Sequence, residues 1–216
     1  MSEIASDVAA PGVCRGRFIS FEGIDGAGKS TQIASLCERI RAAGYDVVLT
    51  REPGGTPLGE KIRGMLLSDE MTLEAETLLF FAARAEHVAK TIRPALERGA
   101  WVISDRFADA TYAYQVGGKG LAEEKARSIE DWTLSGFAPE LTVLFDLSPE
   151  GAAARRGARG AAANRFEREG LDFFSRVRRR YLERASAAPE RFLVVDASLA
   201  PEAIAAQIAE RVSSWL

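Results

Sequence analysis

Residues 23–30, with the sequence GIDGAGKS, constrain this chain more than any other stretch. They match the pattern G-x-x-x-x-G-K-[ST], follow a short apolar run and open a segment with a helical pattern, which is the context that a phosphate-binding loop requires. The glycines let the backbone wrap around a phosphate chain without a clash from a Cβ atom, and successive N–H groups at the start of a helix attract the anion. The stretch therefore predicts a strand, a loop and a helix that together hold a nucleoside triphosphate.

Each residue of this loop is expected to contribute to the triphosphate site. Lys29 should reach the β- and γ-phosphates, and the hydroxyl of Ser30 should bind Mg²⁺. A glycine-rich turn with a surface lysine is the structural alternative, and it leaves the full match in this context unexplained. Because switches, motors and transferases share the loop, it leaves the reaction open. The residues expected to bind the triphosphate are Gly23, Ile24, Asp25, Gly26, Ala27, Gly28, Lys29, Ser30 and Thr31.

Short apolar runs alternate with helical patterns along the rest of the chain. This alternation indicates βαβ units, and therefore an α/β fold of the P-loop NTPase type, a parallel five-stranded sheet covered by helices on both faces. The runs show little polar alternation, which predicts strands buried on both faces. The predicted strands are 17–22, 46–50, 101–104, 141–146 and 192–195, and the predicted helices are 29–43, 58–67, 73–98, 122–135, 150–156, 171–187 and 201–215.

The size and composition of the chain fit one domain. It has 216 residues, of which 47% are hydrophobic and 27% are charged, as in ordinary globular proteins. Residues 1–16 lack periodicity and predict a flexible tail before a single domain at 17–216. Cys14 and Cys37 offer no disulfide framework, which indicates the reducing cytoplasm. The net charge of −3 and the absence of an apolar run of about 18–20 residues argue against a nucleic acid or a membrane as partner.

Polar residues follow two of the predicted strands at the edge where such sheets bind ligands. Asp105 could hold Mg²⁺ directly or through water, and Arg106 beside it could clamp a phosphate. Asp146, at the end of another strand, is the competing candidate for the metal. The turn at 51–57, with the sequence REPGGTP, lies at the same edge. A plain connecting loop would account for its glycines and prolines but not for its Arg-Glu pair.

Several of these segments resemble one family of kinases. They are residues 21–23 (FEG), 51–56 (REPGGT), 80–84 (FFAAR), 105–107 (DRF) and 113–115 (AYQ). Together they resemble thymidylate kinase of the bacterial type with an arginine-rich lid, over about residues 17–216. This resemblance implies an enzyme that transfers the γ-phosphoryl group of ATP to dTMP with Mg²⁺ and forms dTDP for dTTP biosynthesis. It also implies a cytoplasmic protein, commonly a homodimer, whose partners are ATP and dTMP.

The resemblance assigns the base and the sugar of dTMP to particular residues. Phe80 would stack on the thymine ring, and Arg84, on the same helix face, would hydrogen-bond a carbonyl oxygen of the base. Thr111 and Gln115 match polar residues around the base and the sugar. Tyr114 matches an aromatic residue that occupies the place of a ribose 2′-hydroxyl and so favours deoxynucleotides. Phe80 has a structural alternative, because it belongs to the apolar run LLFF and burying one phenylalanine stabilises a fold by roughly 1.5–3 kcal/mol.

The resemblance also assigns the acceptor phosphate. Arg106 resembles the arginine that grips the phosphate of dTMP, and Asp105 the carboxylate beside the transferred group. Arg63 matches a second arginine on the monophosphate, for which an exposed helix charge is the alternative. Glu52 matches an acid near the sugar and the acceptor phosphate. Asp25 occupies a loop position where the family carries an acid, and it could contact the acceptor or the metal.

Residues 155–168 are rich in arginine and glycine and predict a mobile lid that closes over the triphosphate. Some thymidylate kinases carry a catalytic arginine in the phosphate loop, but positions 25–27 hold none here, so the lid is expected to supply it. Arginine at the γ-phosphate can contribute about 10³–10⁵ in rate. Arg155 is expected to bind ATP, and a solvated basic loop is the alternative. The residues expected to be catalytic are Lys29, Asp105, Arg106, Arg159 and Arg165.

Other classes of function fit the sequence less well. A guanine-nucleotide switch would show the base-reading motif N-K-x-D, and the chain has none. Another deoxynucleotide or nucleoside kinase would differ only in its acceptor, and the combination of Phe80, Arg84 and Thr111 favours thymine. His87 is the only histidine, without paired cysteines to complete a metal cluster, and is expected to be structural.

Overall fold

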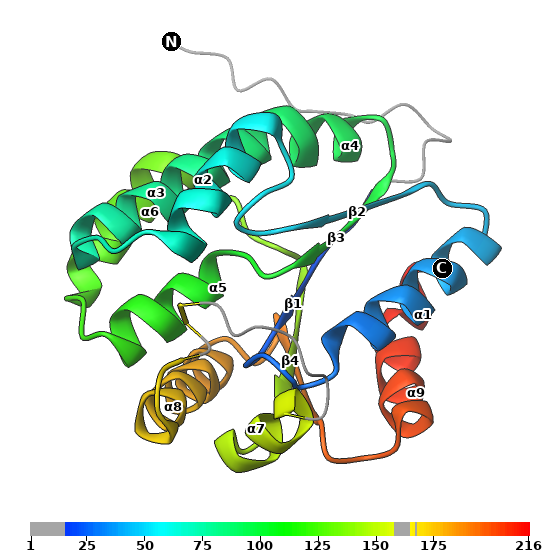
Figure 1. The fold of residues 1–216 in the computed structure, drawn as a ribbon. Coiled ribbons are helices and arrows are strands. Elements are labelled where there is room, and N and C mark those ends of the chain that lie inside the picture. The colour runs from blue at the N-terminus through cyan, green and yellow to red at the C-terminus, as the bar shows by residue number, and fades with distance from the viewer. Residues whose placement is uncertain (1–15, 158–164, 167) are drawn as a thin grey trace, which may run out of the picture.

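The computed structural model describes residues 16–157, 165, 166 and 168–216. Five strands form one sheet in the order β2-β3-β1-β4-β5, and all neighbouring strands run parallel. The predicted parallel five-stranded sheet is therefore confirmed, and each predicted strand lies within one residue of the observed bounds. The strands are β1 (Phe18–Glu22), β2 (Val47–Arg51), β3 (Trp101–Asp105), β4 (Leu141–Asp146) and β5 (Phe192–Asp196) (Figure 1).

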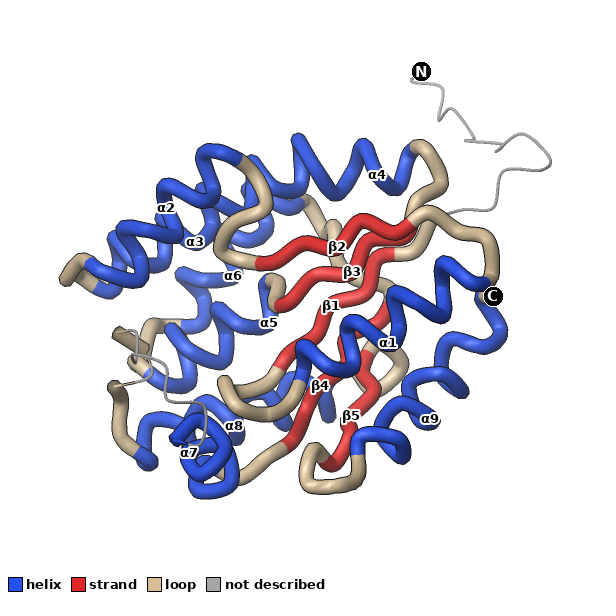
Figure 2. The backbone as a smooth tube through the Cα atoms, turned by 45° about the vertical axis from the view of Figure 1, so that its right-hand side comes forward, coloured by secondary structure: helices blue, strands red, loops and turns tan. Residues whose placement is uncertain are grey.

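Helices cover both faces of the sheet, as predicted. Figures 1 and 2 show α1 and α9 together on one face and α2, α3, α4, α5, α6 and α8 on the other. No helix among the described residues combines the length and the apolar character needed to cross a membrane. The helical segments are α1 (Lys29–Ala42), α2 (Pro57–Ser68), α3 (Leu73–His87), η1 (Val88–Ile92), α4 (Arg93–Glu97), α5 (Ala108–Thr111), η2 (Tyr112–Gly118), α6 (Glu123–Leu134), α7 (Pro149–Gly157), α8 (Leu171–Ala187), α9 (Pro201–Val212) and η3 (Ser213–Trp215).

The core lies on both sides of β1, because successive side chains of a strand point to opposite faces. Ile19 belongs to the cluster that includes Ile33 of α1 and Ile204 of α9. Phe18 packs on the opposite face, where its ring meets the ring of Phe107 edge to face at 4.9 Å. The central strand is thus fixed from both sides, and the loop that follows it starts from a rigid position.

The two edge strands differ from the prediction that all strands are buried on both faces. The side chain of Leu49 in β2 is 54% exposed and that of Val194 in β5 is 43% exposed. The sheet order places both strands at its margins, where the helices that cover the middle do not shield every residue. An apolar run indicated a strand correctly but did not reveal its place in the sheet.

The long helix predicted at 73–98 is interrupted. It consists of α3, one π-helical segment η1 and α4, which carries Pro94 in its first turn. Proline cannot donate a backbone hydrogen bond and crowds the carbonyl of the preceding turn, so a local widening of the helix accommodates it. The other predicted helices end within one residue of the observed bounds or continue into a short 3₁₀ turn, η3.

The helical stretch formed by α5 and η2 was missed by the sequence analysis. Most of its residues are buried, including Tyr112, Ala113 and Gln115. A helix that is buried on several sides lacks the polar stripe from which helical periodicity is recognised. This stretch matters for function because it carries several of the predicted dTMP-binding residues.

Candidate functional site

The predicted phosphate-binding loop connects β1 to α1, with α1 beginning at Lys29. Gly23 has a φ of 129°, and a Cβ atom there would lie 2.6 Å from the carbonyl oxygen of Phe145, so only glycine fits this position. Gly28 is the N-cap of α1 in the left-handed conformation, with a φ of 96°. The N-cap carries no side chain that could accept the first N–H groups of the helix. These groups therefore remain available for an anion.

Lys29 is buried at the base of this loop. Its Nζ donates to the carbonyl oxygen of Gly23 at 3.1 Å and lies 3.8 Å from Oδ1 of Asp25 and 3.9 Å from Oδ1 of Asp105. Burial lowers the pKa of the lysine, while the neighbouring carboxylates act in the opposite direction. The predicted donor lysine and the predicted metal-binding aspartate are therefore direct neighbours.

Asp105 fits a metal ligand better than its competitor. Its Oδ1 is buried and has no hydrogen-bond partner among the described residues. Asp146, by contrast, accepts two hydrogen bonds from Arg178, at 2.6 and 2.9 Å. The described residues contain no group of three or more acidic, histidine or cysteine ligands. A single carboxylate such as Asp105 is compatible with Mg²⁺, which commonly binds through one or two carboxylates together with substrate phosphates and water.

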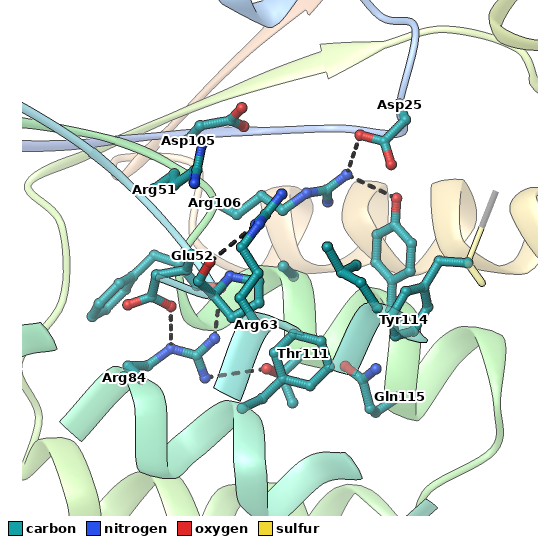
Figure 3. A pocket seen from close by; sticks show the side chains of 16 residues that line it. Asp25, Arg51, Glu52, Arg63, Arg84, Asp105, Arg106, Thr111, Tyr114 and Gln115 are labelled. Atoms are coloured by element: carbon teal, nitrogen blue, oxygen red, sulfur yellow. Dashed lines mark hydrogen bonds and ion pairs between the residues drawn. The ribbon is translucent and has the colours of Figure 1, made fainter. Parts of the chain in front are cut away.

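Arg106 lies directly after β3 and is held at both its backbone and its guanidinium group. It has a φ of 74°, which is unusual for a residue with a side chain and keeps the side chain turned toward the phosphate-binding loop. Its Nη2 donates to Oδ1 of Asp25 at 2.9 Å and to the hydroxyl of Tyr114 at 3.0 Å (Figure 3). Its Nη1 donates to the hydroxyl of Tyr181 at 3.1 Å. The arginine is thus oriented before any ligand is bound.

Glu22, which was not predicted as a site residue, is linked to Arg106 through the hydroxyl of Tyr181. One of its carboxylate oxygens accepts the backbone N–H of Phe107 at 2.7 Å, and the other accepts the hydroxyl of Tyr181 at 2.6 Å. Burial raises the pKa of Glu22 to about 7. A lone acid at the end of an otherwise apolar strand was a usable sequence signal, whereas Tyr181 on α8 offered none.

A central cavity lies beside Arg106 and brings together every residue that was predicted to bind dTMP (Figure 3). It opens at the carboxyl ends of β2 and β3, between α2, α3 and the α5–η2 stretch. This is the position that the parallel sheet predicts for a ligand. The predicted residues that line it are Asp25, Glu52, Arg63, Phe80, Arg84, Arg106, Thr111, Tyr114 and Gln115, and Arg51, Pro53, Leu67, Asp105, Phe107, Ala110 and Phe166 complete the lining.

Arg84 and Glu52 form a buried ion pair in the wall of the cavity. Nε of Arg84 donates to Glu52 at 2.6 Å, and its two terminal nitrogens donate to Thr111 Oγ1 at 3.1 Å and to the carbonyl oxygen of Phe107 at 3.2 Å. A guanidinium group has five N–H donors, so two remain beyond these three bonds. His87 contacts the other oxygen of Glu52 at 3.0 Å, which fits the predicted structural role of this histidine.

Phe80 and Phe81, neighbours in the apolar run at 78–81, have different environments. Phe81 is fully buried in the core. Phe80 is only partly buried and lines the cavity, with its ring centre 6.0 Å from that of Phe166. Arg63 of α2 also lines the cavity and donates to the carbonyl oxygen of Pro53 at 3.0 Å.

The arginine-rich segment is described only in part. Arg159 lies outside the described residues. Nη1 of Arg155 is 3.5 Å from the carbonyl oxygen of Ala27 in the phosphate-binding loop. Arg165 is held on the side of the cavity, where its Nη2 donates to Glu76 at 2.6 Å and to the carbonyl oxygen of Leu66 at 3.1 Å.

The fold and the loop together define a P-loop NTPase, and a partly polar cavity lies next to the loop. Comparison with known proteins narrows this class. The thymidylate kinase family model matches residues 21–208. Thymidylate kinase of Burkholderia cenocepacia is 56% identical over 205 residues, which are 93% of this chain and 98% of the relative. Thymidylate kinase of Ralstonia nicotianae is 53% identical over 203 residues, covering 92% and 98% of the two chains.

A solved structure agrees with these sequence relatives. The crystal structure of thymidylate kinase from Ehrlichia chaffeensis superposes with a TM-score of 0.71 at 34% identity, covering 84% of this chain and 93% of that one. The chain belongs to the thymidylate kinase family. It is an enzyme, a kinase that phosphorylates dTMP in the synthesis of dTTP, as the sequence analysis predicted.

Proposed function

We propose that ATP binds on residues 23–31 and dTMP in the central cavity, so that the two phosphate groups meet between Lys29 and Arg106. One observation carries this proposal. A single oxygen, Oδ1 of Asp25, lies 3.8 Å from Nζ of Lys29 and 2.9 Å from Nη2 of Arg106. Lys29, which is expected to bind the phosphates of ATP, and Arg106, which is expected to bind the phosphate of dTMP, are therefore separated by one carboxylate group. Two phosphates that replaced it would be within reacting distance.

The reaction needs positioning more than covalent chemistry. An oxygen of the dTMP phosphate attacks the γ-phosphorus, the bond to the β–γ bridging oxygen breaks, and ADP leaves with the electron pair. Lys29 and Arg106 would stabilise the charge that spreads over the transferred group. Ser30 and Asp105 would hold Mg²⁺, which neutralises phosphate charge when it is bound. Arg155 and Arg159 would contact the triphosphate, and Arg165 would have to leave Glu76 in order to join them.

The acceptor would lie with its base against α3 and its phosphate toward Arg106. In this arrangement Phe80 stacks on thymine, and Arg84 uses a remaining N–H donor for a carbonyl oxygen of the base. Thr111 and Gln115 line the polar side of the base and the sugar, and Tyr114 leaves no room for a ribose 2′-hydroxyl. Glu52 and Arg63 would act near the sugar and the acceptor phosphate.

A coupled ADP-release assay across the four deoxynucleoside monophosphates tests the assignment. The wild-type chain should turn over dTMP far faster than dAMP, dGMP or dCMP. Lys29→Ala should lower kcat by about 10²–10³-fold or more, because an electrostatic group at the transferred phosphate is lost, while the circular dichroism spectrum stays unchanged. Near-normal turnover in a folded Lys29→Ala variant would contradict the proposed role of the loop.

Phe80→Ala separates the proposed base contact from a packing role. Stacking of a base on an aromatic ring is worth about 1–3 kcal/mol, so KM for dTMP should rise about tenfold or more. KM for ATP should stay within about twofold. Equal effects on both KM values, together with a lower melting temperature, would assign Phe80 to the core instead.

We further propose a cytoplasmic homodimer that forms through α3 and α6. Leu78 on α3 is 53% exposed and Trp132 on α6 is 81% exposed. Between these helices lies a groove whose exposed surface is mostly apolar, lined by Glu74, Thr77, Leu78, Leu121, Glu124, Lys125, Ser128 and Ile129. Exposed apolar surface of this kind is typical of association sites. Homodimers are also common in the family that the sequence resembles.

A further inference from the structure

Glu76 is a buried acid that contacts Gln115, a lining residue of the central cavity, and that the proposed mechanism does not use. It lies on α3, four residues before Phe80, and only 1% of its side chain is exposed. Its Oε1 accepts the Nε2 of Gln115 at 2.8 Å. Its Oε2 accepts Nζ of Lys119 at 2.7 Å and Nη2 of Arg165 at 2.6 Å. Two cations thus compensate the buried charge, and the first oxygen is left for the amide of Gln115.

This contact decides which way the amide of Gln115 faces. A side-chain amide presents a donor at its nitrogen and an acceptor at its oxygen, and it can turn over when its surroundings accept both orientations. An ionised carboxylate can only accept, so the nitrogen must face Glu76. Figure 3 shows the amide oxygen of Gln115 on the side of Thr111 and its nitrogen on the far side. Gln115 lines the central cavity, so the cavity is offered an acceptor.

An acceptor at this place distinguishes pyrimidines by their hydrogen-bonding edge. Thymine carries an N3–H donor beside a 4-carbonyl acceptor, whereas cytosine carries an N3 acceptor beside a 4-amino donor. Arg84 can only donate, and the oxygen of Gln115 can only accept. This pair complements thymine, and it would oppose like groups at both positions in cytosine. Unpaired polar groups in a buried site reject the wrong ligand strongly.

We propose that Glu76 is a positioning residue that fixes the amide oxygen of Gln115 toward the base and thereby selects 4-keto pyrimidines over cytosine. This inference rests on the proposed binding of dTMP in the central cavity. It assigns Glu76 an indirect role, because the residue acts through Gln115. Lys119 supports the same carboxylate from the end of η2 and has no part in the selection.

Glu76→Gln tests the proposal in the full-length chain. A glutamine at position 76 can donate or accept, so Gln115 is free to turn over. The ratio of kcat/KM for dTMP to that for dCMP should fall about tenfold or more, mainly through a higher KM for dTMP, while KM for ATP stays within about twofold. Glu130→Gln is the matched control, because Glu130 accepts a hydrogen bond from Tyr112 outside the cavity. Lys119→Met removes a cation from Glu76 but keeps its bond to Gln115, so the ratio should persist.

Gln115→Leu provides a second measurement that does not depend on folding of the Glu76 variant. It should lower the same ratio to a similar extent, and adding Glu76→Gln should then have little further effect. An unchanged ratio in either folded variant, or independent effects that multiply in the double variant, overturns the proposal. Failure of the wild-type chain to phosphorylate dTMP at all would instead overturn the proposed function.

Discussion

Glu22 is the residue whose environment departs most from that of an ordinary acid. Its side chain is fully buried near Arg106, and burial raises its pKa to about 7, against 4.5 for an exposed glutamate. The folded protein therefore keeps a proton on this group at pH values where the unfolded chain has released it. This stabilisation is complete below about pH 4.5 and is lost as the pH rises through about 7.

The pH dependence of unfolding should reveal this group. Because of this pKa difference, the free energy of unfolding should fall by about 3 kcal/mol between pH 4.5 and pH 8 through the titration of Glu22. Glu22→Gln should remove that part of the pH dependence, as measured by urea unfolding at several pH values. Glu97→Gln, on the exposed end of α4, should retain it. A Glu22→Gln variant with the same pH profile as the wild type would show that the group titrates like an exposed acid.

The contributions of single residues to the site were only partly predictable. The residues predicted to bind dTMP were taken from the motif resemblance, and all of them line the central cavity. Glu76 and Tyr181 were not predicted as site residues, because each contacts the site only through a residue distant in the sequence. Glu76 contacts Gln115, and Tyr181 contacts Arg106. A helical pattern says which face a residue occupies but not which distant side chain it meets.

At the scale of elements, the turn after β2 combines sequence pattern and strict geometry. Gly55 has a φ of 76°, and a Cβ atom there would lie 2.4 Å from Nε2 of His87 and 2.6 Å from Oγ1 of Thr50. Those two side chains are hydrogen-bonded to each other, and His87 also contacts Glu52. The turn can therefore support the Glu52–Arg84 pair only when position 55 has no side chain.

A pair of glycine substitutions tests this geometry. Gly55→Ala should destabilise the fold by about 2–4 kcal/mol, because it adds backbone strain and displaces His87. Gly64→Ala in α2, where a Cβ atom meets nothing within 4 Å, should instead stabilise it by about 0.5–1 kcal/mol. Thermal and urea unfolding measure both changes. Equal effects of the two substitutions would contradict the role given to the turn.

The elements themselves were predictable to the extent that they follow a simple period. Amphipathic helices such as α8 and buried central strands such as β4 were located with their observed bounds. The α5–η2 stretch has no polar face and could not be recognised, and the exposure of β2 depends on sheet order rather than on its own residues. The long helix was predicted without a break, although Pro94 lies just after the π-helical segment that interrupts it.

At the scale of the whole molecule, the proposed homodimer predicts a specific dependence on the face formed by α3 and α6. Leu78→Asp should convert the dimer to a monomer, because it places a charge within an apolar interface, and sedimentation velocity measures the change. Leu199→Asp, at an exposed leucine of similar accessibility before α9, should leave the dimer intact. A monomeric wild-type chain would contradict the proposed homodimer, and a dimer that tolerates Leu78→Asp would place the interface on another face.

The oxygen atom of Asp25 that faces both Lys29 and Arg106 would couple the two proposed substrate sites. Whichever nucleotide arrives first must separate one cation from this aspartate, and the aspartate, now paired with a single cation, attracts that cation more strongly. Through this carboxylate the second nucleotide would meet more resistance, so each substrate would lower the affinity for its companion by the same factor. Antagonism of this kind would weaken the complex that holds both nucleotides and so would hasten the departure of the first product after transfer.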